Sequence, residues 1–586
     1  MRRESGGPRI DPITREVVAN SLASAAEEMS RALRRSAYSA IIYDMLDYSC
    51  ALFGRNGELI SQAKNLPAQL GVMSSAIAFM LRKFPAEETH PGDVFIMNHP
   101  YFGATHTNDV IVFAPIYYRD RLMGYAGTNA HHMDVGGKTP ATEAADAVEI
   151  WQEGLLLPIV KLYERGTPNQ ALLDVIEANV RIPKETLGDV RSQIAACRTG
   201  ERRWIELCER HGVDALERYV EDLWSYSEAM IRGEIGAMRN GTYRAEDYMD
   251  PDLYGTDPVK IVVTVTVSDE AIHADFTGTG PQVRGSMNCP LSSTMSAIWY
   301  AVRCMIDADV PMNEGCYRPI SWTVPEGCLL NPTPPAAVSI RHLASLRAAD
   351  VVLKALCEAK PERSAAGCSV SFPTFGAAGV DPRTDEPYIC ADIIGGGMGG
   401  HGHGDGLSAI DTHLGNCAMM FAEALELEAP LRVLKTELVP DSGGAGKHRG
   451  GLAVERWYEV DSPGMTIAGW YADQTLDETR PWGVHGGGRG QRAAVIFNPG
   501  RDDERELPGR GVNFQTKLGD ALSMRGAGGG GWGRPEDRDA SALAWDIKNG
   551  YVTLEGAKLD YGFVPAGTGA TAPDVCEEAS ARDGTL

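Results

Sequence analysis

The segment GDVFIMNHPYFGATHTNDVIVFAPIYYRDRLMGYAGTNAHHMDVGG, residues 92–137, contains three β-like runs separated by turn residues. These runs are DVFIMN (93–98), NDVIVFAPIYY (108–118) and RLMGYAGTNAHHMDV (121–135). Their β-branched and aromatic residues are typical of strands. The segment therefore predicts a β-rich region near the N-terminus, and it also holds four of the 13 histidines of the chain.

Helical and strand-like patterns flank this region on both sides. Apolar residues at helical spacing follow Asp11-Pro12, a favourable cap and first-turn pair, and predict a helix over 11–38. The other predicted elements are strands at 48–53 and 58–63, a helix around 69–83, helices through 169–238, strands at 259–269 and 271–278, helices at 291–307 and 343–359, strands with glycine-rich loops over 388–525, and a short helix near 539–548.

Together these elements predict a mixed α and β (α+β), multi-domain chain. The strands and helices lack the regular alternation of a doubly wound sheet or a (β/α)₈ barrel. The predicted units are an N-terminal α+β region (1–165), a helical segment (166–240), a second α+β region (241–380), a β- and glycine-rich region (381–563) and a flexible tail (564–586).

Charge and hydropathy exclude several classes of protein. The 586 residues include 79 acidic and 55 basic side chains, a net charge of −24, which disfavours nucleic acid and anionic membranes as partners. No apolar stretch approaches the ~18 residues of a membrane helix, and the N-terminus has no apolar signal core. We therefore expect a soluble, cytoplasmic protein. Its 12 cysteines contain no CxxC pair, which predicts buried free thiols.

Histidines and carboxylates gather in the NHPYFGATHTND and AHHMD parts of the quoted segment. His106 and Asp109 are three residues apart in a turn that leads into a strand, and His131 can join them from a neighbouring strand. Two imidazoles and one carboxylate suit a divalent transition metal such as Mn²⁺, Fe²⁺ or Zn²⁺. The alternative is that these histidines only form hydrogen bonds in a β core.

Side chains of consecutive residues in a strand point to opposite faces, which separates the residues next to His131 from it. His131 and His132 face opposite ways in a strand, so only one of them should bind a metal directly. Asp134 has the same parity as His132 and is a candidate outer partner or general base if the strand bends at Gly136-Gly137. Asp47 precedes the strand-like run YSCALF, where an aspartate is usually a cap or turn residue.

The glycine-rich segments do not provide a nucleotide site. GGGMGG (395–400) is followed by HGHGDG rather than a helix, so it lacks the context of a dinucleotide-binding turn. GGAGKH (443–448) lacks the spacing and the Ser/Thr of a phosphate-binding loop. His401 and His403 are a candidate metal pair, although a polar loop is the simpler interpretation. If ATP is used, another chain should bind it.

Several motifs in order resemble the hydantoinase B/oxoprolinase family over about residues 10–563. They are DYSCALF, GDVFIMNHPYFGATHTND, AHHMDVGG, EIWQEGLLLPIVKL, DVPMNEGCYRPISWTVPEGCLLNPTPPAAVS, DSGGAGKHRGGLAVER, GAGGGGWGRPEDRD and IKNGYV. The family includes subunits of N-methylhydantoinases, caprolactamase and ketone carboxylases. The resemblance places His106, Asp109 and His131 at metal-ligand positions and Asp47 at the same site. Asp134, Glu149 and Glu153 also match motif positions.

This resemblance implies a hetero-oligomeric, ATP-dependent enzyme that hydrolyses a carbon–nitrogen bond of a small cyclic amide. A hydantoinase A-like ATPase subunit would bind ATP-Mg and phosphorylate the carbonyl oxygen. This chain would supply the metal site (Mn, Zn or Fe) for ring opening, with Asp47 or Asp134 as the catalytic base. The alternatives are a subunit of a biotin-independent ketone carboxylase and a non-catalytic structural subunit. RHLASLRAAD (341–350) departs from the family pattern, so Arg341 and His342 should reshape the substrate pocket.

Overall fold

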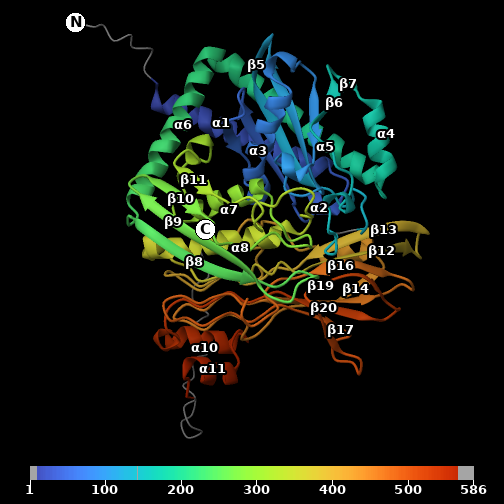
Figure 1. The fold of residues 1–586 in the computed structure, drawn as a ribbon, viewed down its shortest axis with the longest axis vertical. Coiled ribbons are helices and arrows are strands. Elements are labelled where there is room, and N and C mark those ends of the chain that lie inside the picture. The colour runs from blue at the N-terminus through green and yellow to red at the C-terminus, as the bar shows by residue number, and fades with distance from the viewer. Residues whose placement is uncertain (1–9, 141–142, 565–586) are drawn as a thin grey trace, which may run out of the picture.

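A seven-stranded antiparallel sheet forms the N-terminal part of the computed structural model, which describes residues 10–140 and 143–564 (Figure 1). The strand order is β2-β1-β5-β4-β3-β6-β7. The strands are β1 (Tyr48–Gly54), β2 (Leu59–Gln62), β3 (Val94–Met97), β4 (Asp109–Tyr118), β5 (Arg121–His131), β6 (Val160–Glu164) and β7 (Thr167–Pro168). This sheet confirms the predicted β-rich region.

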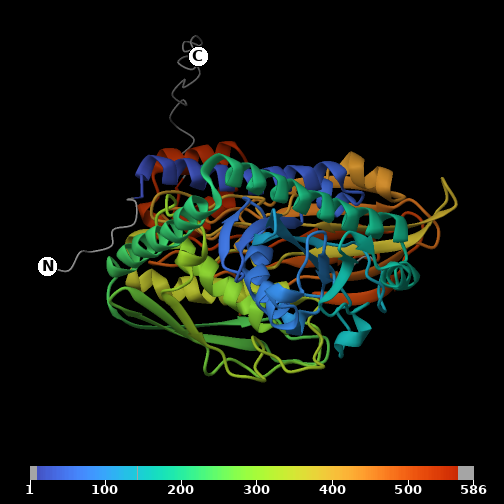
Figure 2. The same ribbon diagram turned by 90° about the horizontal axis from the view of Figure 1, so that it is seen from above.

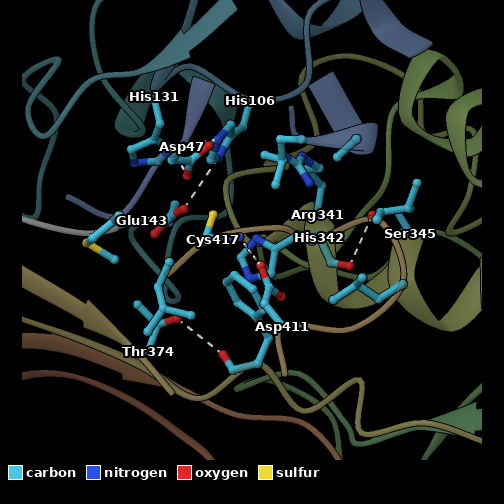
Figure 3. A pocket seen from close by; sticks show the side chains of 18 of the residues that line it. Asp47, His106, His131, Glu143, Arg341, His342, Ser345, Thr374, Asp411 and Cys417 are labelled. Atoms are coloured by element: carbon cyan, nitrogen blue, oxygen red, sulfur yellow. Dashed lines mark hydrogen bonds and ion pairs between the residues drawn. The ribbon is translucent and has the colours of Figure 1, made fainter. Parts of the chain in front are cut away.

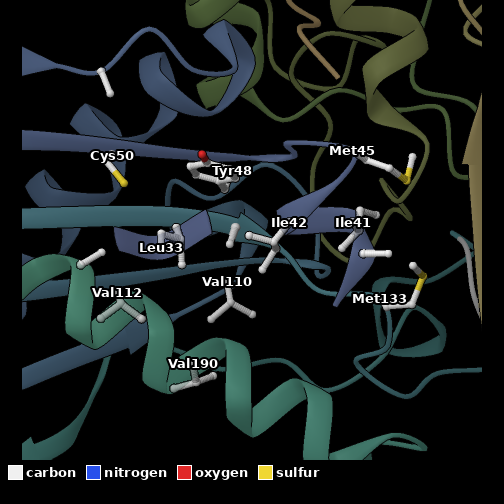
Figure 4. Close-up of a cluster of buried hydrophobic side chains, with 14 of the residues drawn as sticks. Leu33, Ile41, Ile42, Met45, Tyr48, Cys50, Val110, Val112, Met133 and Val190 are labelled. Atoms are coloured by element: carbon white, nitrogen blue, oxygen red, sulfur yellow. The ribbon is translucent and has the colours of Figure 1, made fainter. Parts of the chain in front are cut away.

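Helices cover both faces of this sheet. Side chains alternate along β4. Val110 and Val112 pack with α1 and α5 (Figure 4), whereas Ile111 and Phe113 pack with α3 on the other face. Figure 2 shows α1 (dark blue) side by side with the long blue-green helices α5 and α6, along one face of the molecule. Because both faces are buried, β1 is apolar at nearly every position, which explains YSCALF. The helices are α1 (Pro12–Ser36), α2 (Ala40–Tyr43), α3 (Pro67–Lys83), α4 (Gln170–Asn179), α5 (Pro183–His211) and α6 (Val213–Gly236).

A second sheet, in the order β11-β10-β9-β8, lies beyond two buried helices. Helix α3 packs on α7, α7 on α8, and α8 on β8 and β9, so α8 is enclosed. These elements are β8 (Gly241–Met249), β9 (Val259–Ser268), β10 (Ala271–Asp275), β11 (Ile320–Thr323), α7 (Leu291–Cys304) and α8 (Arg341–Ala359).

The C-terminal part holds two further sheets, in the orders β13-β12-β16-β19 and β14-β15-β20-β17-β18. Their strands are β12 (Thr374–Asp381), β13 (Glu386–Ile393), β14 (Leu431–Leu438), β15 (Val454–Val460), β16 (Thr466–Tyr471), β17 (Ala494–Phe497), β18 (Arg505–Leu507), β19 (Arg510–Gln515) and β20 (Ala521–Arg525). The helices here are α9 (Ala422–Glu428), α10 (Ala540–Lys548) and α11 (Leu554–Tyr561). Short 3₁₀ helices are η1 (Ala86–Glu88), η2 (Pro100–Phe102), η3 (Ile150–Gln152), η4 (Glu314–Cys316), η5 (Pro361–Arg363) and η6 (Pro535–Asp537).

The glycine-rich segments pack backbone against backbone. The amide of Gly397 donates to the carbonyl of Ala527 at 3.0 Å, and the amide of Gly444 donates to the carbonyl of Gly529 at 2.8 Å. A Cβ at Gly529 would lie 1.9 Å from the carbonyl oxygen of Met398, which leaves no room for a side chain. The clustering of glycine in the sequence therefore reflects close approach of several chain segments.

The predicted elements differ from the observed ones mainly where a short element is held by its neighbours. The elements that were not predicted are strands β6, β7, β8, β11 and β12 and helices α2, α9 and α11. The alternation of hydrophobicity in β8 is weak because its buried positions Ala245, Asp247 and Met249 include a small and a charged residue. The predicted division into domains stays a prediction, and residues 565–586 of the predicted tail lie outside the described residues. No helix within the described ranges is both long and apolar enough to span a membrane.

Candidate metal centre

The predicted site residues lie at the ends of three neighbouring strands. Asp109 is the first residue of β4 and His131 the last of β5, and the two are direct partners in the antiparallel ladder. Asp47 immediately precedes β1, and its carbonyl accepts a hydrogen bond from the backbone N–H of His131 at 3.0 Å. One end of the sheet thus brings together residues 47, 109 and 131.

His106 reaches the same place from the turn before β4. The backbone N–H of Asp109 donates to the carbonyl of His106 at 3.2 Å, which closes this turn. The ring atom Nδ1 of His106 lies 2.8 Å from the carbonyl oxygen of Ser339. A carbonyl can only accept a hydrogen bond, so Nδ1 carries the proton and the lone pair of Nε2 faces the other site residues.

Three donor atoms converge at nearly equal distances. His106 Nε2 is 3.1 Å from Asp109 Oδ1 and 3.2 Å from His131 Nδ1, and His131 Nδ1 is 3.2 Å from Asp109 Oδ1. Two bonds of about 2.1 Å to one cation would place their donors about 3.0 Å apart at a right angle and about 3.4 Å apart in a tetrahedron. These three side chains therefore fit a transition-metal ion by donor type and by spacing.

Burial and charge support the same arrangement. The three side chains are 1–7% exposed. Burial opposes ionisation of Asp109, but the two histidines outweigh it and hold the pKa of that carboxyl well below its usual range. Burial would lower the pKa of His131, but the hydrogen bond with Asp109 and the charge of Asp47 raise it to about 9. Without a metal, His131 therefore carries a proton beside the carboxylates of Asp47 and Asp109, and a bound metal cation would replace that proton.

A surrounding layer of hydrogen bonds orients these groups. Gln69 donates through Nε2 to Asp47 Oδ1 at 2.7 Å and lies 3.4 Å from Asp109 Oδ1. The hydroxyl of Thr105 donates to Asp109 Oδ2, and the guanidinium of Arg341 lies 3.5 Å from the same oxygen. Such outer partners fix the rotamers of metal-binding side chains.

His106 and His131 line a cavity of about 60 Å³, which has room for a few water molecules. Figure 3 shows Asp47, His106 and His131 together, with Glu143 close by and Arg341 and His342 reaching in from α8. Residues from the predicted units 1–165, 241–380 and 381–563 line it. The site therefore forms where distant parts of the chain meet.

His342 and Glu143 complete the polar wall. His342 is 7% exposed and its Nε2 has no hydrogen-bond partner among the described residues. Burial, helped by the charge of Arg341, lowers the pKa of His342 well below its usual range, so this imidazole is neutral. Glu143 lies 3.5 Å from His106 Nδ1 through Oε1 and accepts a hydrogen bond from Tyr471 at 2.9 Å through Oε2.

The side chains of His132 and Asp134 lie away from this cavity, as expected if they point to the face of the strand opposite to His131. His132 Nε2 is 3.0 Å from the side-chain oxygen of Gln193 on α5. The carboxylate of Asp134 is buried against Arg181, with Oδ1 2.7 Å from the guanidinium. The structure thus brings His106, Asp109, His131 and Asp47 together, whereas the carboxylate of Asp134 is engaged elsewhere.

Sequence patterns do not identify every residue at this cavity. Arg341 and His342 stand out as departures from the family pattern, but nothing in the sequence gives a role to Gln69, Glu143 or Tyr471. No local pattern marks these residues, because each reaches the site only through packing between segments far apart in the chain. A separate buried cluster of Asp350, Cys368 and His413 was likewise not predicted.

These observations define a class: a mixed α and β protein with several sheets and a buried His/Asp cluster, suited to a divalent metal, at the end of its N-terminal sheet. The chain belongs to the hydantoinase B/oxoprolinase family, whose model matches residues 11–535. This finding confirms the resemblance seen in the sequence.

Individual relatives match nearly the whole chain. The B component of a putative D-/L-hydantoinase from Pseudomonas sp. (strain NS671) is 34% identical over 94% of this chain and 95% of its own length. The crystal structure of the ATP-dependent caprolactamase from Pseudomonas jessenii matches with a TM-score of 0.88 at 28% identity, covering 96% of this chain and 98% of that one. A nucleotide-free acetone carboxylase structure matches with a TM-score of 0.86 at 21% identity, covering 94% and 80%, which shows a shared fold.

Proposed function

We propose that this chain is the metal-containing catalytic subunit of an ATP-dependent enzyme that opens a cyclic amide of the hydantoin, oxoproline or lactam type. The observation that carries the proposal is the convergence of His106, Asp109 and His131 beside a cavity. The similarity to a putative hydantoinase component and to an ATP-dependent caprolactamase supports the choice of reaction.

An amide resists hydrolysis because resonance makes its carbonyl carbon a weak electrophile and because its nitrogen is a poor leaving group. Transfer of a phosphoryl group to the carbonyl oxygen gives an imidate phosphate, whose carbon is a better electrophile. Water adds to this carbon, the C–N bond then breaks as the nitrogen takes up a proton, and hydrolysis of the remaining acyl phosphate gives the ring-opened acid and phosphate. We assign the phosphoryl transfer to an ATPase partner of the hydantoinase A type. The relatives from the hydantoinase and from caprolactamase are named as the B and beta components of their enzymes, which supports such a partner.

This chain would then bind the activated ring and deliver water to it. A divalent cation held by His106, Asp109 and His131 would supply Lewis acidity and lower the pKa of a bound water. Asp47 is the proposed base, because Gln69 anchors Oδ1 while Oδ2 lies 3.9 Å from His131 Nδ1 at the cavity wall. A carboxylate held in this way can accept a proton from a water placed between the two groups.

Arg341 and His342 are the proposed substrate-binding residues. The Nε atom of Arg341 is buried without a hydrogen-bond partner among the described residues, and its guanidinium lines the cavity. A guanidinium binds phosphate oxygens well, so the role assigned to Arg341 is to hold the phosphoryl group of the activated ring. The neutral ring of His342 offers Nε2 for a hydrogen bond to the ring amide.

The test is reconstitution with an A-type ATPase subunit. The complex should convert hydantoin, 5-oxoproline or caprolactam to the ring-opened acid with stoichiometric formation of ADP. His131→Ala should abolish ring opening while the complex still assembles, as size-exclusion chromatography can show. Fixation of labelled bicarbonate into a carbon-bonded carboxylate would instead identify a carboxylase. Full activity without metal and in the variant would identify a structural subunit.

A further inference from the structure

A second cluster of candidate metal ligands lies apart from the proposed active site. It consists of Asp350 on α8, Cys368 after η5 and His413 in the loop before α9, and one donor atom of each lies within 4.8 Å of the others. His413 Nε2 is 2.8 Å from Asp350 Oδ1. All three side chains are at least 92% buried.

Neighbouring groups hold the cluster in place. The indole N–H of Trp482 donates to Asp350 Oδ2 at 2.6 Å, and the backbone N–H of Cys368 lies 3.2 Å from Asp350 Oδ1. The sulfur of Cys368 accepts a hydrogen bond from the backbone N–H of Gly399 at 3.3 Å. Each anionic donor is therefore supported by an N–H group, as is usual around metal-binding carboxylates and thiolates.

A cavity of about 250 Å³ adjoins these three residues. Further thiol and imidazole groups line the same cavity, from Cys304, Cys357, His401 and His403. The histidines of the HGHGDG segment thus lie at the wall of a cavity that already holds a buried His, Cys and Asp. The cluster has space beside it for water or a small ligand.

The simpler interpretation is a buried ion pair, in which Asp350 only fastens the loop of His413 to α8. That interpretation accounts for the contact between Asp350 and His413. It does not account for a third donor, the Cys368 sulfur, within the same 4.8 Å, or for an adjoining cavity lined by soft donors. A carboxylate and a thiolate would together balance the charge of a divalent cation.

We propose that Asp350, Cys368 and His413 form a second metal site that takes a borderline-soft divalent cation such as Zn²⁺, with an open position towards the adjoining cavity. One carboxylate, one thiolate and one imidazole form a donor set that prefers Zn²⁺ over Mg²⁺ or Ca²⁺. Binding removes the proton from the Cys368 thiol and releases it to solvent as the metal–sulfur bond forms.

Cobalt(II) distinguishes this site from the first one, because only a thiolate ligand gives a near-ultraviolet sulfur-to-cobalt charge-transfer band. The donor set of His106, Asp109 and His131 contains no sulfur. Titration of metal-free protein with Co²⁺ should therefore produce the band in the wild type and equally in His131→Ala.

Cys368→Ser should abolish the band, and Cys304→Ser, a matched change on the wall of the same cavity, should retain it. Zn²⁺ titration should give two equivalents for the wild type and one for Cys368→Ser. His413→Ala serves as the second test if Cys368→Ser fails to fold. A wild type without the band, or a folded Cys368→Ser protein that keeps it, would overturn the proposal. Neither outcome bears on the proposed ring-opening activity.

Discussion

Asp109 and His131 are paired directly across β4 and β5, so the register of one hairpin sets the distance between two proposed ligands. If one of the two strands slipped by one residue, its ligand would turn to the opposite face of the sheet while the other ligand stayed in place. His132 occupies that face now and contacts Gln193 instead. The packing of Val110 and Ile111 on opposite cores penalises such a slip, so the core of the sheet also maintains the site.

Asp109→Ala should lower metal affinity at the cluster of His106, Asp109 and His131 by about tenfold or more, because it removes the anionic donor. Metal content after dialysis against a chelator, measured by mass spectrometry, checks this expectation. Asp120→Ala is the matched control, since Asp120 is exposed in the turn at the other end of the same hairpin. Equal metal content in wild type and Asp109→Ala would contradict the assignment.

Asp134→Asn should reduce stability while leaving the turnover of the folded enzyme within about threefold of wild type. The buried carboxylate loses a charge-assisted hydrogen bond with Arg181, which is about 1–3 kcal/mol of stability. Urea unfolding and kcat measured on the same preparations separate the two effects. If kcat collapses while the unfolding midpoint stays unchanged, Asp134 is catalytic after all.

Glu153→Gln should become increasingly stabilising, relative to wild type, as the pH rises from about 5 to 8. Burial raises the pKa of Glu153 to about 8, although the N–H groups of Ser339 and Val338 oppose this shift. The folded protein therefore keeps a proton that the unfolded chain loses near pH 4.5, so wild-type stability falls as the pH rises through this window.

The glutamine variant carries no such proton, and the stability difference should level off above about pH 8. Thermal unfolding midpoints at several pH values check the trend. Glu149→Gln is the control, because Glu149 is exposed. A difference between Glu153→Gln and wild type that does not vary with pH would contradict the expected protonation of Glu153.

Arg341→Ala should lower kcat/KM for ring opening by about a hundredfold, and Arg341→Lys should restore part of the loss. A lysine keeps the charge but cannot make the paired contacts of a guanidinium to phosphate oxygens. Lys354→Ala on the same helix is the control, since Lys354 donates to the carbonyl of Glu246 instead. If Arg341→Ala leaves kcat/KM unchanged, the phosphate must be held elsewhere.

Gly529→Ala should destabilise the protein by more than about 2 kcal/mol, because the added Cβ would meet a neighbouring backbone carbonyl. Gly233→Ala should have the opposite sign, with a gain of about 1 kcal/mol. Gly233 lies inside helix α6 with open space around its Cβ position. Denaturant midpoints of the two variants provide the comparison, and equal effects would exclude tight backbone packing as the cause.

The sequence predicts most elements and the residues at the strand ends, because the information for both is local. Alternation and turn residues define β4 and β5, and His106 and Asp109 share one turn. The remaining site geometry is not local. The carbonyl that fixes the tautomer of His106 belongs to Ser339, 233 residues away, and no pattern near either residue indicates their contact. Strand parity, by contrast, correctly separates His132 from His131.

The construction of the cavity also sets an order of events during synthesis. Both histidines and the aspartate leave the ribosome within the first 131 residues, whereas Ser339, Arg341 and Tyr471 follow much later. The nascent chain thus contains the three donor residues long before the later residues that orient them have been synthesised. Tight metal binding should therefore require nearly the full-length chain, and prematurely terminated translation products should bind the metal weakly.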